Sequence, residues 1–205
     1  MDGFERKTLK TSRGYTYTYY TSEGDRSLPT LFFQHGWPDH AEMWKGIADR
    51  LMDTKFPVII PDMLGYDGTD KPTDPVEYKW DVMTQDLIDI IDTEKVDKVI
   101  SIGHDWGARA VFGAAVVDPD KIDRMVIIAS AHPAAGQLTD FHYLKGSWHA
   151  FYFQLPFAEE TVAHDDYVFI EDWWRDASPD WDIPSEDLEK VKHTFRQPGV
   201  VQSAL

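Results

Sequence analysis

Short apolar runs alternate with amphipathic stretches over the first two thirds of the chain. Continuous apolar runs of four to six residues bounded by turn residues are typical of strands in a buried parallel sheet. The predicted strands are residues 15–20, 31–34, 58–60, 99–102 and 125–128. Between them, residues 80–92 repeat large apolar side chains at helical intervals, and residues 108–117 are apolar and mostly small. This alternation predicts a mostly parallel α/β sheet flanked by helices.

The pattern changes after His132 and Pro133. The remaining residues are aromatic, acidic and helical in character, with no further clear strand. We therefore expect two parts, a sheet-forming part over residues 1–135 and a helical part over residues 136–205.

The segment Gly103–Ala108 (Gly-His-Asp-Trp-Gly-Ala) lies between a predicted strand and a predicted helix. A side chain lifted clear of a sharp strand-to-helix turn brings its neighbours close to other backbone, so only small residues fit around it. Gly103 and Gly107 stand two positions before and after Asp105, which predicts that Asp105 occupies the nucleophile position of such an elbow. In the alternative interpretation, Asp105 is a surface aspartate that caps the helix.

Two further motifs follow strands. His35-Gly36-Trp37-Pro38 comes directly after the predicted strand 31–34, and Pro61–Pro72 (Pro-Asp-Met-Leu-Gly-Tyr-Asp-Gly-Thr-Asp-Lys-Pro) follows the predicted strand 58–60. Together with the elbow, these motifs resemble the epoxide hydrolase and haloalkane dehalogenase branch of the α/β-hydrolases, in the same order and spacing. The resemblance runs from residue 10 to Leu205, and it implies an α/β-hydrolase core followed by a partial helical cap, with the C-terminal strands absent.

The resemblance implies covalent catalysis by Asp105. Its carboxylate would attack an epoxide carbon to form an alkyl-enzyme ester, and the backbone N–H groups of Trp37 and Trp106 would form the oxyanion hole. The pocket floor would be shaped by flanking residues of the two motifs. These are His35, Pro38 and His104.

His149 stands five residues before Gln154, where epoxide hydrolases usually carry the first ring-opening tyrosine of the cap. Its imidazole could donate a hydrogen bond to the epoxide oxygen as the C–O bond breaks. In the alternative interpretation, His149 is a structural histidine of a lid helix.

Hydrolysis of the ester requires a histidine base oriented by a carboxylate. The resemblance places both groups after the cap, beyond Leu205, and none of the eight histidines occupies the base position. We therefore expect ester formation without sustained turnover. Two alternatives stay open: a dehalogenase, in which the Trp106 indole N–H would hold the departing halide, and a non-catalytic binding module derived from the fold.

The charge balance limits the classes of molecule that the chain is expected to bind. The chain has 36 acidic and 20 basic residues and a net charge of −16, which disfavours nucleic acids and anionic membranes and suits a small uncharged organic substrate. It has no cysteine, so thiol catalysis and thiolate metal sites are excluded. We expect no metal or other cofactor, since carboxylate attack needs none. No apolar run reaches membrane-spanning length and no secretory signal is evident, which predicts a cytoplasmic enzyme.

Overall fold

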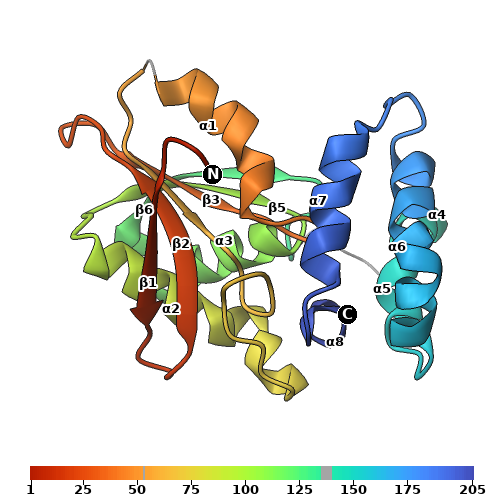
Figure 1. Cartoon of the computed structure of the whole chain (residues 1–205). Helices are drawn as coiled ribbons and strands as arrows, with labels where there is room; N and C mark the ends of the chain where they lie inside the picture. The colour runs from red at the N-terminus through yellow and green to blue at the C-terminus, as the bar shows by residue number, and fades with distance from the viewer. Residues whose placement is uncertain (53, 135–139) are drawn as a thin grey trace. The chain divides into compact units, whose positions relative to one another are not determined.

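The computed structural model describes residues 1–52, 54–134 and 140–205, and they form two compact units (Figure 1). The first unit is Met1–Ser130 and the second is Ala131–Leu205. The expected boundary between residues 135 and 136 lies outside the described residues. In the described ranges, none of the helices combines the length and the apolar character needed to cross a bilayer.

The first unit is built on a six-stranded sheet. Its strands are β1 (Glu5–Lys10), β2 (Thr16–Ser22), β3 (Thr30–Gln34), β4 (Val58–Pro61), β5 (Val99–His104) and β6 (Ile122–Ile128). They lie in the order β1-β2-β4-β3-β5-β6. The β1–β2 and β2–β4 pairs are antiparallel, whereas β4–β3, β3–β5 and β5–β6 are parallel. This confirms the mostly parallel sheet and all five predicted strands.

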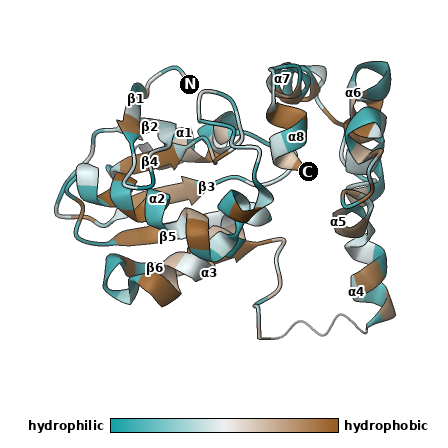
Figure 2. Cartoon of the chain, turned by 90° about the horizontal axis from the view of Figure 1, so that it is seen from below, coloured by the Kyte–Doolittle hydropathy of each residue, from teal (hydrophilic) through white to brown (hydrophobic). Residues whose placement is uncertain are grey.

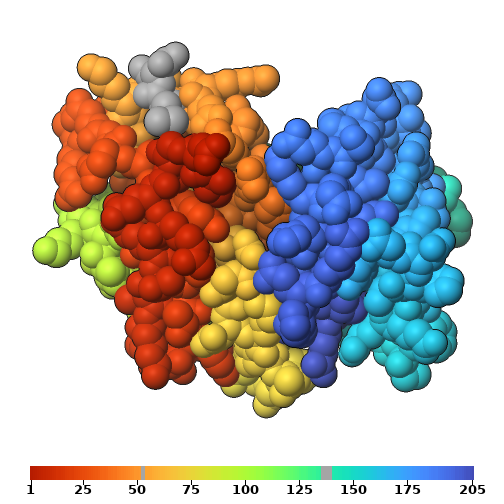
Figure 3. Space-filling view, in the orientation of Figure 1, coloured from red at the N-terminus to blue at the C-terminus, as the bar shows by residue number. Residues whose placement is uncertain are grey.

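The sequence pattern did not predict β1. Its residues, Glu-Arg-Lys-Thr-Leu-Lys, are largely charged, and the strand lies at the edge of the sheet, paired only with β2. The N-terminal residues, red in Figure 3, lie open on the surface in that view. Charged side chains are common on edge strands because they prevent pairing with other chains. β1 therefore lacks the apolar signal that identified the other five strands.

Helices cover both faces of this sheet. The 3-10 turn η1 (Ala41–Trp44) and α1 (Lys45–Met52) lie on one face, and α2 (Trp80–Thr93) and α3 (Trp106–Val117) lie on the other (Figure 1). Two further 3-10 turns, η2 (Pro75–Tyr78) and η3 (Pro119–Lys121), precede α2 and β6. The sequence predicted α2 and α3 to within two residues at each end.

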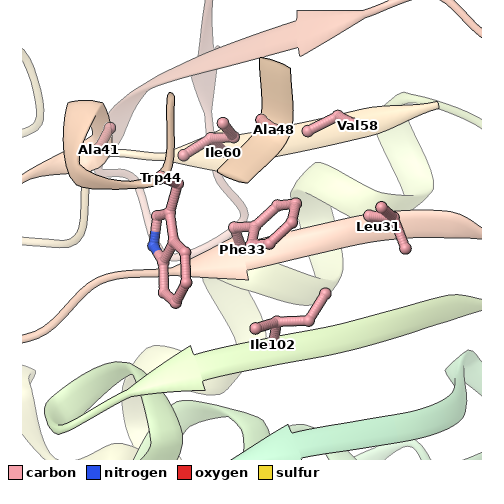
Figure 4. Packing of buried hydrophobic residues seen from close by; sticks show 8 residues of the cluster. All are labelled: Leu31, Phe33, Ala41, Trp44, Ala48, Val58, Ile60 and Ile102. Atoms are coloured by element: carbon pink, nitrogen blue, oxygen red, sulfur yellow. The ribbon is translucent and has the colours of Figure 1, made fainter. Parts of the chain in front are cut away.

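An apolar cluster joins η1 and α1 to the sheet (Figure 4). The Phe33 ring of β3 packs against the Trp44 ring of η1, with ring centroids 5.1 Å apart. Ile60 of β4 and Ile102 of β5 complete this layer. The inner strands β3 and β5 are largely brown in Figure 2, which marks hydrophobic residues. Burial of each large side chain contributes roughly 1.5–3 kcal/mol, so the cluster fixes the loop that follows β3.

A buried polar network ties α2 to the start of the chain. The Asp86 carboxylate of α2 is inaccessible to solvent and accepts a hydrogen bond from the Thr11 hydroxyl at 2.6 Å and from the Tyr17 hydroxyl at 3.1 Å. Arg13 forms an ion pair with the same carboxylate. A buried charge is tolerated only when it is paired and hydrogen-bonded, and this network satisfies both oxygens.

The second unit consists of helices. They are α4 (Phe141–Gly146), α5 (Trp148–Tyr152), α6 (Ala158–Ala177), α7 (Ser185–Phe195) and α8 (Val200–Ala204). The helical path of α6 is interrupted at His164–Tyr167, where Asp165, Asp166 and Tyr167 have positive φ. Arg196 holds this interruption through two hydrogen bonds, of 2.8 and 2.7 Å, to the Asp166 carboxylate.

Candidate active site

Asp105 lies on a sharp turn between β5 and α3. Its φ of 52° and ψ of −115° belong to neither strand nor helix and are rarely adopted by an L-residue. A Cβ added to Gly107 would lie 2.2 Å from the Gln34 carbonyl oxygen, and one added to Gly103 would lie 2.5 Å from the Gly107 carbonyl oxygen. The glycines are therefore required by close backbone approach, as the sequence pattern predicted.

The loop after β3 reaches the same turn. The Trp37 backbone N–H donates a hydrogen bond to Asp105 Oδ1 at 3.0 Å. A Cβ on Gly36 would lie 2.5 Å from the His104 carbonyl oxygen and 2.6 Å from Asp105 Cβ, so only glycine allows this approach. The structure thus brings together two motifs that are 68 residues apart in the sequence.

Trp106 is the first residue of α3 and directly follows Asp105. The backbone N–H groups in the first turn of a helix have no acceptor within the helix. Its indole side chain is 49% exposed. The Trp106 N–H therefore has no acceptor within α3, and its indole is partly open to solvent.

His35 is fully buried, and both of its ring nitrogens contact backbone groups. Nε2 accepts a hydrogen bond from the Met63 N–H at 2.9 Å, and Nδ1 lies 3.2 Å from the Gly36 carbonyl oxygen. The ring also packs edge-on against Tyr66, with centroids 4.8 Å apart. Burial is the main cause that lowers the pKa of His35 to about 3, so the imidazole is neutral.

His104 and Pro38 flank the same turn. His104 is half-buried at the end of β5, and its buried Nδ1 has no hydrogen-bond partner among the described residues. Burial lowers the pKa of His104, and the neighbouring Asp105 carboxylate opposes that shift. Pro38 is buried directly after Trp37.

His149 lies in α5 of the second unit, within an aromatic cluster. Its ring packs against Trp173 with a centroid distance of 5.1 Å, and against Phe153 and Trp148 at 5.9 and 6.2 Å. Edge-to-face contacts of this kind hold a ring in one orientation.

Asp62 was not among the residues that the sequence singled out, although it belongs to the Pro61–Pro72 motif. Its Oδ1 accepts the Ala41 N–H at 3.3 Å, and its Oδ2 has no hydrogen-bond partner among the described residues. Burial is the main cause that raises the pKa of this carboxyl to about 8, and the nearby Asp67 adds to it. The buried carboxyl is therefore largely protonated at neutral pH. Its partner is 21 residues away in the sequence, so the pattern gave no signal.

A cavity of about 380 Å³ lies where β3 and β4 begin. Asp105 follows the other end of the parallel strands. The wall of the cavity includes Lys7, Arg26 and Lys98 together with Glu94 and Asp97. This mixture of charges selects neither anions nor cations, and the cavity is remote from Asp105. Within the described part of the chain, no group of three His, Asp or Glu side chains is arranged to hold a metal ion.

Comparison with known proteins places these features in a family. The family model described as the alpha/beta hydrolase fold matches residues 29–186. The YfhM protein of Bacillus subtilis, of the AB hydrolase superfamily, is 30% identical over the whole chain, which covers 72% of that protein. The chain belongs to the α/β-hydrolase fold family.

Within this family, the similarity lies with the epoxide hydrolase branch. Human epoxide hydrolase 4 is 27% identical over 91% of the chain, which covers 54% of that protein. The structure of the epoxide hydrolase CorEH without ligand superimposes with a TM-score of 0.85 at 23% identity, over 98% of this chain and 71% of that one. The chain therefore spans between about half and three quarters of the length of these relatives.

Proposed function

We propose that the chain is an epoxide hydrolase-like enzyme in which Asp105 is the nucleophile. The observation that carries this proposal is the Trp37 N–H that donates to Asp105 Oδ1 at 3.0 Å, at a strained strand-to-helix turn. A surface aspartate that merely caps a helix would accept a hydrogen bond from the first turn of that helix, and Asp105 makes no such side-chain bond to α3.

The hydrogen bond also assigns the two carboxylate oxygens. Oδ1 is held by Trp37, so we assign Oδ2 as the attacking atom. Oδ2 forms a bond to an epoxide carbon, the C–O bond of the ring breaks, and the released alkoxide takes a proton from water. Oδ1 becomes the ester carbonyl oxygen, already bonded to the Trp37 N–H. That N–H, together with the N–H that we assign to Trp106, would stabilise its negative charge during hydrolysis.

The second half of the reaction needs a histidine and a carboxylate that activate water. The family resemblance assigns these groups to a segment that follows the cap. We propose that the 205-residue chain carries out the first half-reaction and retains the ester. The net charge of −16 favours an uncharged organic epoxide as substrate.

We assign residues 136–205 the role of the cap and His149 that of a hydrogen-bond donor to the epoxide oxygen. The aromatic rings around His149 support this assignment, because they form an apolar setting in which one donor can determine orientation. Replacement of His149 by Phe retains an aromatic ring and removes the donor. It is expected to slow ester formation by about 10²-fold, measured as the rate at which the adduct appears.

The experiment is incubation of the purified chain with a terminal aryl epoxide, followed by intact-mass measurement. We expect a mass gain of one epoxide per chain in the natural protein and in Asp120→Ala, which removes an exposed carboxylate of η3. Asp105→Ala should gain none. Equal labelling of Asp105→Ala and the natural chain would exclude Asp105 as the nucleophile, and no labelling of a folded chain would favour a binding module.

Dehalogenation is the second candidate. Trp106 directly follows Asp105 and its indole is 49% exposed, so its N–H is accessible to a departing halide. Incubation with a chloroalkane in place of the epoxide would then give the corresponding alkyl adduct and one equivalent of free chloride.

A further inference from the structure

We propose that His35 is a positioning residue that holds the Gly36–Trp37 peptide in place, so that its N–H points at Asp105. This inference rests on the proposed function for its catalytic meaning. The hydrogen bonds around His35, in contrast, can be tested in a chain that shows no activity.

The contacts of the His35 ring determine which of its nitrogens carries the proton. The Met63 backbone N–H is a donor, so the Nε2 atom that lies 2.9 Å from it must be an unprotonated acceptor. A neutral imidazole then carries its proton on Nδ1, which lies 3.2 Å from the Gly36 carbonyl oxygen. The two contacts require the same tautomer, and in that tautomer His35 donates to Gly36.

The Gly36 carbonyl and the Trp37 N–H are opposite ends of one planar peptide unit. The carbonyl oxygen accepts from His35 Nδ1 and also from the Asp39 N–H at 3.0 Å, which occupies both of its lone pairs. The N–H at the other end donates to Asp105 Oδ1 at 3.0 Å. Because the unit is planar, fixing the direction of the carbonyl also fixes the direction of the N–H.

The hydrogen bond from His35 to the Gly36 carbonyl also strengthens the Trp37 N–H as a donor. Donation to a carbonyl oxygen polarises the peptide, so the N–H at its other end becomes a better donor, an effect estimated at roughly 10–30% per bond in a chain of hydrogen bonds. An oxyanion-hole donor is useful in proportion to how well it is oriented before the reaction starts. His35 therefore acts on Asp105 through the peptide, without contact with the substrate.

The surroundings of His35 keep the ring neutral. It is fully buried, and His40 and His104 oppose a positive charge there, whereas the Gly36 carbonyl favours one. Tyr66 fixes the ring plane by an edge-on contact. A protonated ring would have a donor at Nε2 facing the Met63 N–H donor, and that repulsion disfavours the charged form.

The first test uses the natural chain. Nitrogen-15 NMR of the histidine side chains distinguishes a protonated from an unprotonated ring nitrogen. We expect His35 to show a protonated Nδ1 and a bare Nε2, unchanged between pH 5 and pH 8. A proton on Nε2, or a ring that titrates in this range, would overturn the proposal whether or not Asp105 is a nucleophile.

The second test uses two variants that each keep one of the two contacts. The side-chain amide nitrogen of Asn occupies the place of His Nδ1, so His35→Asn keeps the donor to Gly36 and loses the acceptor for Met63. The side-chain oxygen of Gln occupies the place of Nε2, so His35→Gln keeps the acceptor and loses the donor. A purely structural role would make the two variants equivalent.

The readout is the chemical shift of the Trp37 amide proton, with Asp105→Ala as the reference for a lost hydrogen bond. We expect His35→Asn to keep the natural shift and His35→Gln to move toward the Asp105→Ala value. In chains that form the ester, His35→Gln should slow its formation at least about tenfold and His35→Asn much less. Equal shifts in the two folded variants would overturn the positioning role. A normal shift pattern without any ester would instead contradict the nucleophile assignment alone.

Discussion

Asp105 has a backbone conformation that is expensive for any residue with a Cβ. A non-glycine residue at such a φ and ψ costs about 1–3 kcal/mol, and the surrounding glycines and strands must hold it in place. The free-energy cost of this backbone conformation does not depend on the carboxylate. It can therefore be measured in variants that lack the carboxylate.

We predict that Asp105→Gly is more stable than Asp105→Ala by about 1 kcal/mol, because relief of the strain exceeds the extra chain entropy of glycine, about 0.5–1 kcal/mol. Both variants lose the carboxylate, so the comparison isolates the backbone. The free energy of unfolding in urea measures the difference. If the alanine variant were equally stable, the turn would not be strained.

Asp62 makes the stability of the folded chain fall as the pH rises, which is the opposite of the usual effect of a carboxyl group. Its folded-state pKa is raised to about 8 by burial, whereas an unfolded aspartate titrates near 4. The folded state therefore binds the proton more tightly, so this contribution to stability is fully present below pH 4 and is lost as the pH rises toward 8.

We expect Asp62→Asn, which keeps an oxygen for the Ala41 N–H, to remove this dependence. The free energy of unfolding of the natural chain should fall relative to that of the variant by at most about 1.4 kcal/mol per pH unit between pH 4 and pH 8. Urea titrations at several pH values test this. Parallel curves for the two chains would show that Asp62 ionises normally.

At the scale of elements, the site depends on how closely β3, β5 and α3 approach one another. Gly107 at the start of α3 contacts the end of β3, where an added Cβ would lie 2.2 Å from the Gln34 carbonyl oxygen. Gly46 in α1 has open space around it, with nothing within 4 Å of an added Cβ. Substitution by alanine at Gly107 therefore tests the close contact, and the same substitution at Gly46 is its control.

We predict that Gly107→Ala lowers the free energy of unfolding by about 2 kcal/mol or more, because backbone must move to admit the methyl group. Gly46→Ala should instead raise it by about 0.5 kcal/mol, since alanine favours the helix. Thermal unfolding of the two variants against the natural chain checks both signs. A harmless Gly107→Ala would contradict the close contact between α3 and β3.

The sequence was informative about elements wherever burial left an apolar pattern. The strands around β3 and β5 and the elbow between β5 and α3 could be located from their apolar runs and glycines. The edge strand β1 could not, because its residues are mostly charged, whereas the other edge strand, β6, kept an apolar run. The contacts of His35 and Asp62 could not be predicted either, since their partners Met63 and Ala41 are 28 and 21 residues away.

In the molecule as a whole, β6 is an edge strand of the sheet in the first unit. Apolar side chains of this strand are unusually open to solvent: Met125 is 44%, Val126 43% and Ile128 39% exposed. The relatives that match this chain are longer than it is, with 72% of YfhM and 54% of human epoxide hydrolase 4 covered. The turn that carries Asp105 and the loop that contains Trp37 nevertheless lie within the first unit.

The proposed reaction requires that the Asp105 carboxylate forms a covalent ester with the substrate. The most direct measurement is fragmentation mass spectrometry of the proteolysed chain after incubation with an epoxide. We expect the added mass to map to Asp105 alone. An adduct on any other residue, or diol production that continues in Asp105→Ala, would contradict it.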